Sequence, residues 1–133
     1  MIIRPFLFAL SCLSACLAHA QDTPLFRMQS GTMVFQEVAR DERTSTIDML
    51  QLSGSVLGKS MFMLRAGCSL MKERGMPGFT IEALSRQPLR LLMRFASAEE
   101  AREHGGQPLR EGGLISAAHC EAIAAAVARG HGA

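Results

Sequence analysis

The fold of this 133-residue chain is constrained first by its N-terminal segment, which has the three-part pattern of a secretory signal. A positive charge at Arg4 is followed by an apolar run over residues 5–17, and small residues lead up to Ala20. The run is shorter than the ~20 residues that a helix needs to cross a bilayer. We therefore expect residues 1–20 to be a signal peptide that is cleaved between Ala20 and Gln21.

A second cleavage chemistry competes with the first. The segment Leu13-Ser14-Ala15-Cys16 resembles the lipobox of bacterial lipoproteins. That resemblance implies a lipoprotein signal over residues 1–15 and a lipid on Cys16, which would hold the protein at a membrane surface. Cleavage before Gln21 would instead release it into the periplasm or the medium. Both alternatives stay open, and both predict export.

The remaining chain, residues 21–133, has a size suited to one small domain. Without Arg4 it carries 13 lysines and arginines against 12 acidic residues, because the whole chain has 14 and 12. Nucleic-acid binding needs a strongly basic face, so this balance argues against it. No later segment is long and apolar enough to span a membrane, so a lipid on Cys16 is the only membrane attachment expected.

Two cysteines, Cys68 and Cys120, remain after either cleavage. Exported proteins meet an oxidising compartment, so we expect these two residues to form a disulfide. Two buried free thiols acting as small apolar side chains are the alternative. A catalytic redox pair is disfavoured because the sequence has no Cys-x-x-Cys motif.

Hydrophobic periodicity indicates two β-hairpins and two main helices. Alternating residues predict strands, whereas apolar residues at steps of three and four predict helices. Ser97 and Glu100 have the spacing of a capping box at the start of a short helix. The expected strands span residues 32–39, 44–52, 79–84 and 89–95, with a short helix over residues 47–52 as the alternative to the second strand. The expected helices span residues 59–74, 97–104 and 114–129.

Each main helix carries one apolar stripe with a cysteine in its middle. We expect an α+β domain of ββαββα order, in which the two hairpins form a four-stranded antiparallel sheet and the two main helices cover one face of it. That arrangement would bring Cys68 and Cys120 together. The predicted stripes consist of Leu57, Met61, Leu64, Cys68 and Met71 in the first helix, and of Ala117, Cys120, Ile123, Ala124 and Val127 in the second.

The sequence contains no recognisable catalytic, cofactor or metal motif. His119 and Cys120 are adjacent, but neighbouring helical residues point about 100° apart, so they do not make a nucleophile–base pair. Methionine is frequent, and thioethers are soft ligands. Cu(I) handling by Met63, Met76 and a histidine is therefore one alternative function, and a small secreted hydrolase is another.

The segment Met61–Phe79 resembles a stretch found in small, mostly uncharacterised exported proteins of bacteria, which implies an envelope location and no particular activity. We expect a non-enzymatic envelope or periplasmic domain without a cofactor, which contacts another envelope protein or a surface component. The open face of the sheet, where Arg90, Leu92 and Arg94 would stand, is the expected interaction surface.

Overall fold

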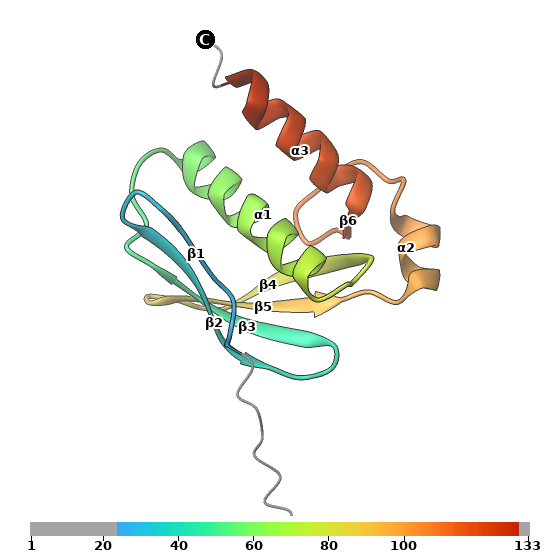
Figure 1. Cartoon of the computed structure of the whole chain (residues 1–133), viewed down its shortest axis with the longest axis horizontal. Coiled ribbons are helices and arrows are strands. Elements are labelled where there is room, and N and C mark those ends of the chain that lie inside the picture. The colour runs from blue at the N-terminus through green and yellow to red at the C-terminus, as the bar shows by residue number, and fades with distance from the viewer. Residues whose placement is uncertain (1–23, 131–133) are drawn as a thin grey trace, which may run out of the picture.

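A computed structural model describes residues 24–130, which form a six-stranded antiparallel sheet and three helices (Figure 1). The strands follow the order β1-β2-β3-β5-β4-β6 across the sheet. None of the helices in this part of the chain has the length and hydropathy of a membrane-spanning segment. The elements are β1 (Arg27–Ser30), β2 (Met33–Arg40), β3 (Thr44–Leu50), α1 (Val56–Glu73), β4 (Gly78–Arg86), β5 (Leu89–Phe95), α2 (Ala98–His104), β6 (Ile115–Ser116) and α3 (Ala117–Gly130).

The expectations about export concern a different part of the chain. The signal peptide over residues 1–20, its cleavage site between Ala20 and Gln21, and the alternative lipidation site Cys16 all lie outside the described residues.

The α+β class is correct, but the predicted four-stranded ββαββα architecture is wrong. Two further strands extend the sheet at its edges: β1 pairs with β2, and β6 pairs with the start of β4. Arg27–Ser30 lacks β-branched and aromatic residues, so it gives little strand signal, although Gly31 with its φ of 59° makes the turn into β2. The strand β6 has only two residues, too few for any alternation to be visible.

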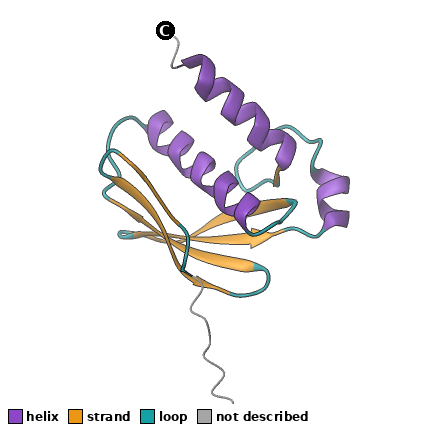
Figure 2. Ribbon diagram, viewed as in Figure 1, coloured by secondary structure: helices purple, strands orange, loops and turns teal. Residues whose placement is uncertain are grey.

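Both predicted hairpins are present, and they join through β3 and β5 in the centre of the sheet. The pairing of Ile47 with Leu91 puts one apolar residue from each hairpin on the same face. Phe35, Phe79 and Met93 lie on this face as well and are fully buried. Figure 2 shows the strands on one side of the molecule and the two long helices on the other. The core therefore lies between the sheet and α1.

The helix α1 covers the core, but with a different face from the predicted one. Its buried residues include Phe62, Ala66 and Leu70, whereas Leu57, which we placed on the core side, is 71% exposed. Gly67 lies over the ring of Phe79, where a Cβ atom would come within 3.0 Å of the ring. The helix can therefore approach the sheet closely at this point because glycine has no side chain.

The helix α3 does not cover the sheet as predicted. Figure 1 shows it beside α1, running in the opposite direction, on the side of α1 away from the strands. Of the residues in α3 only Ile123 is buried, while Cys120 and Val127 are half-buried. The predicted stripe thus faces another helix instead of a sheet. The short helix α2 starts with the predicted capping box of Ser97 and Glu100.

The C-terminal end of α1 is attached to the sheet by Arg74. Its guanidinium donates hydrogen bonds to the Thr44 carbonyl (2.7 Å), the Ser45 hydroxyl (2.9 Å) and the Asp41 carbonyl. It also lies 4.8 Å from the centroid of the Phe95 ring, a favourable place for a cation. One side chain thereby links α1, the β2–β3 turn and the core.

Next to this arginine, the fully buried Glu37 is completely hydrogen-bonded. Its carboxylate accepts hydrogen bonds from the Arg40 guanidinium, the Ser45 hydroxyl and the backbone N–H of Phe26 (3.1 Å). Burial by itself raises the pKa of a carboxyl, but here the hydrogen bonds from Arg40, Ser45 and Phe26 outweigh it, so the pKa of Glu37 is lowered from 4.5. The group has no unused hydrogen-bonding capacity that would point to a ligand.

Candidate functional site

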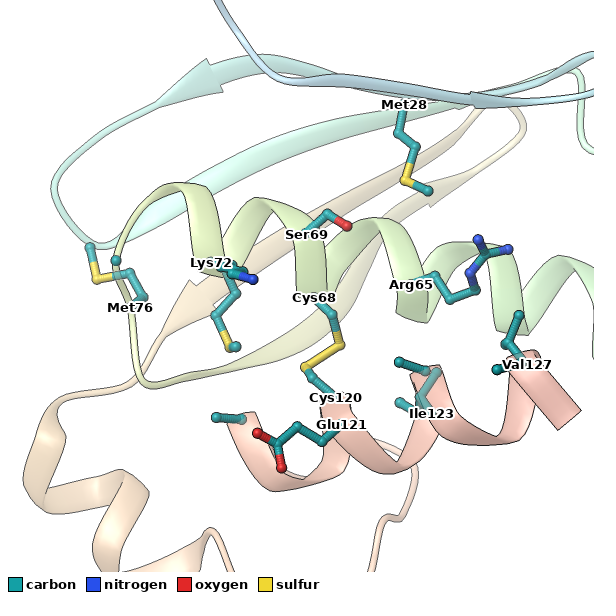
Figure 3. Close-up of a pocket in the computed structure, with 15 residues that line it drawn as sticks. Met28, Arg65, Cys68, Ser69, Lys72, Met76, Cys120, Glu121, Ile123 and Val127 are labelled. Carbon is teal, nitrogen blue, oxygen red and sulfur yellow. A yellow bond between two sulfur atoms is a disulfide. The ribbon is translucent and has the colours of Figure 1, made fainter.

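The described residues form a groove that lies over α1, between α3 and β1. Its volume is about 710 Å³. This volume lies in the range of ligand pockets, which usually have a mainly apolar lining and a few polar groups. Figure 3 shows α1 and α3 side by side along the groove, with Met28 reaching toward α1 from β1.

The floor of the groove is the face of α1 that neither the sheet nor α3 covers. Arg65, Ser69 and Lys72 follow each other at steps of four and three, which places them on one face of a helix. Met76 follows the end of α1 and lines one end of the groove. The sheet-facing residues of α1 lie on the other side, so folding onto the sheet leaves this face free.

One wall of the groove comes from α3, and the side chains of this wall are mostly small. Ala117, Glu121, Ala124 and Ala128 recur at steps of three and four and line the groove. Alanine side chains keep the wall close to the helix backbone, and Glu121 is the acidic residue of this wall. The groove is thus apolar along α3 and carries charges on both helices.

A disulfide between Cys68 and Cys120 joins the two helices inside the groove. The sulfur atoms lie 2.16 Å apart and the Cα atoms 5.7 Å apart, and both residues line the cavity. The sequence pattern thus correctly predicted which residues meet. It did not predict that the link connects α3 to α1 away from the sheet.

Two cations of the groove have no acidic partner in the described part of the chain. Neither Arg65 nor Lys72 takes part in an ion pair within 4.0 Å there. They are two helical turns apart, about 10 Å at the usual helical rise of 1.5 Å per residue. The groove therefore offers two positive charges that form no ion pair with the described residues, beside an apolar surface.

The surface predicted for interaction has its own charges neutralised. Arg90 and Arg94 are exposed on β5 and Leu92 is half-buried, on the face of the sheet opposite α1, as the alternation predicts. However, the Arg90 Nε atom donates to an Asp48 carboxylate oxygen at 2.6 Å, and the hydrogen bond from Arg90 lowers the pKa of Asp48. Arg94 lies 3.7 Å from Glu82. This face offers no unpaired charge at those positions.

The residues suggested for copper are separated in the structure. Met76 lines the groove, whereas Met63 packs against the core cluster and does not line it. Met28 and Met71 accompany Met76 in the groove, which the sequence did not indicate. Within residues 24–130, no three His, Cys, Asp or Glu side chains are grouped so that they could hold a metal ion.

The pair Ser116 and His119 is a helix cap. The Ser116 hydroxyl donates to the Gly105 carbonyl (3.0 Å), and the Ser116 backbone N–H donates to Nδ1 of His119 (3.0 Å). The other ring nitrogen, Nε2, lies 2.7 Å from the Gln107 carbonyl, so the tautomer with hydrogen on Nε2 satisfies both contacts. With Ser116 only 7% exposed, these groups fix the start of α3 and do not form an accessible nucleophile and base.

Comparison of the chain with protein-family models, curated proteins and solved structures found no match. One sequence signal could have indicated the groove: α3 is apolar nearly all round, and a helix of that kind needs cover on more than one side.

Proposed function

We propose that this protein is a non-enzymatic exported binding domain, whose partner from the cell envelope or its surface occupies the groove between α1 and α3. The observation that carries the proposal is the groove itself, about 710 Å³ in volume, which carries unpaired charges next to its apolar lining. Convergence of a few polar groups on an apolar cavity is typical of binding sites.

The composition of the groove supports binding without chemistry. The half-buried methionines Met28 and Met76 can adapt their shape to an apolar partner, and flexible thioether side chains are common at binding surfaces. The Cys68–Cys120 disulfide fixes α3 relative to α1 before any partner arrives. A preformed site loses less conformational entropy on binding.

Export is part of the same proposal and is supported by two independent features. The signal-like residues 1–20 predict secretion, and the cysteines at bonding distance suit an oxidising compartment. We place the protein in the periplasm or outside the cell. A lipid on Cys16 would place it on a membrane surface and would leave the groove available to the same kind of partner.

Photo-crosslinking in cells that export the full chain tests the proposal. A photoreactive amino acid at Ala124 reports on the groove, and one at Arg94 reports on the open face of the sheet. We expect a discrete protein or surface adduct from position 124 and none from position 94. An adduct from position 94 alone would move the binding site to the sheet, and adducts from neither position would contradict a binding role for both surfaces.

A further inference from the structure

We propose that the occupant of the groove is an amphipathic α-helix of a partner protein, with acidic side chains two turns apart. This inference rests on the proposed function, because it names the chemistry of the partner that the groove takes. Three properties of the groove carry it: the shape made by α1 and α3, the incomplete burial of α3, and the spacing of Arg65 and Lys72.

The shape favours a helix. Two antiparallel helices joined side by side leave a furrow between them, and the side-chain ridges of a third helix fit such a furrow. Ala117, Ala124 and Ala128 keep the α3 wall low, so another helix can approach its backbone closely. Recognition of a helix in a groove uses apolar anchors at helical spacing, and Met28 and Met76, which line the groove, can accommodate those anchors.

The incomplete burial of α3 favours a partner larger than a small molecule. Apart from His119, Glu121 and Arg129 the helix consists of apolar residues and a final glycine, yet Ile123 alone is buried. A helix that is apolar on nearly all sides is normally covered on most of them. The exposed alanines of α3 that line the groove form a continuous surface with its floor, and a macromolecular segment can cover both at once.

The charges select an acidic partner. Arg65 and Lys72 are seven positions apart on one face of α1, and neither forms an ion pair with an acidic group of the described residues. A helix that lies along α1 with acidic residues at positions i and i+7 presents its carboxylates at the same separation of about 10 Å. Glu121 on the opposite wall repels an acidic edge, so the partner has to turn its carboxylates toward α1.

The test is a selection from a displayed library of random peptides, long enough for about four helical turns. The full mature protein, with its disulfide intact, is the bait. Selected peptides are then synthesised and measured against four proteins: the wild type, Arg65→Glu/Lys72→Glu, the matched control Arg86→Glu/Arg102→Glu, and Ala124→Trp. The control makes the same change in net charge at two exposed residues outside the groove. Circular dichroism and the mass of the oxidised protein show that each variant is folded.

We expect selected peptides to combine apolar residues at helical spacing with acidic residues two turns apart. Their affinity should fall about tenfold or more for Arg65→Glu/Lys72→Glu, stay unchanged for the control, and be lost with Ala124→Trp, whose side chain fills the groove. Peptides that bind the charge-reversed protein as well as the wild type, but lose affinity with Ala124→Trp, would overturn the acidic partner and leave the proposed function standing.

Other outcomes separate the remaining possibilities. If no peptide is sensitive to Ala124→Trp, the groove is not a peptide-binding site and this inference fails. The crosslinking from position 124 then decides whether the groove binds anything else. Light scattering of the free protein gives a further check: a dimer that Ala124→Trp dissociates would name a second copy of the chain as the occupant and overturn the partner helix.

Discussion

The helices α1 and α3 lie next to each other, yet they are stabilised by different means. The first has five buried residues, among them Phe62 and Leu70, and its C-terminal end is fixed to the sheet by Arg74. The second has one buried residue, Ile123, and is held by the disulfide and by a cap at its start. Burial positions α1, whereas a covalent bond and a few hydrogen bonds position α3.

This difference has a consequence for binding. A helix that contributes its whole apolar surface to the core cannot offer that surface to a partner. Because α3 is positioned without being buried, its alanines and the outward face of α1 remain free to line a groove. The disulfide thus holds α3 in place, as hydrophobic burial holds α1 in place. Substitutions that remove the disulfide, a buried side chain or a cap should therefore affect the two helices differently.

The largest effect is expected from removing the disulfide. The double variant Cys68→Ala/Cys120→Ala opens a loop of 52 residues, for which chain entropy predicts a loss of about 4 kcal/mol in the free energy of unfolding at most. Chemical denaturation measures this loss. Hydrogen exchange should show lost protection throughout α3 while α1 remains protected. Unchanged protection of α3 would show that its packing alone holds it.

A core truncation should distinguish the two helices by burial. Leu70→Ala on α1 is expected to lower the free energy of unfolding by about 3 to 4 kcal/mol, because it leaves a cavity against the sheet. The matched variant Ile123→Ala on α3 should cost less, about 2 kcal/mol, since α3 can shift to close the gap. Equal losses in thermal or chemical denaturation would contradict the different burial of the helices.

The buried carboxylate next to the end of α1 should make stability depend on pH. The pKa of Glu37 is lowered in the fold, so its contribution is complete above the ordinary value of 4.5 and is lost as the pH falls through the lower folded value. We expect Glu37→Gln to cost about 2 kcal/mol at pH 7. The difference from the wild type should shrink below pH 4.5 in denaturation measured at a series of pH values. A difference that stays constant with pH would argue against an ionised Glu37.

The smallest effect concerns the start of α3. His119→Ala removes the acceptor of the Ser116 backbone N–H and should cost about 1 kcal/mol, the usual value of a helix cap. The exposed His104 on α2 supplies the control, because His104→Ala removes no cap of α3. Exchange of the Ser116 amide, directly before α3, should rise in the first variant only. Similar exchange in both variants would show that His119 does not help to hold the start of α3.

The sequence predicted the elements well where the pattern was long. Both central hairpins, α1 and the capping box of α2 follow from local periodicity or from a local motif, which needs no knowledge of the rest of the chain. The pairing of Cys68 with Cys120 could be predicted because these are the two cysteines of the sequence that lie outside the signal-like segment. The short edge strands β1 and β6 lacked a pattern and were missed.

The packing of the helices on the sheet was harder to predict than the elements themselves. The groove between α1 and α3 depends on this packing, so it could not be predicted either. The run Met61-Phe62-Met63-Leu64 is apolar on every side of its helix, so periodicity could not decide which face meets the sheet. The structure selects Phe62 and Leu70, which each lie about 140° around the helix from the centre of the predicted stripe. The stripe then faces α3, and the groove also needs Met28 from a strand that the sequence did not reveal.

The junction of β3 with β5 has a consequence for how quickly the domain folds. Each hairpin is closed by a short turn, so it can form within about 10 µs. The partners Asp48 and Arg90, in contrast, are 42 positions apart, and α1 lies between them in the chain. Contacts of such long range are slow to form because the intervening loop must first be closed. The rate-limiting event should therefore be the docking of two preformed hairpins, with α1 as the tether between them.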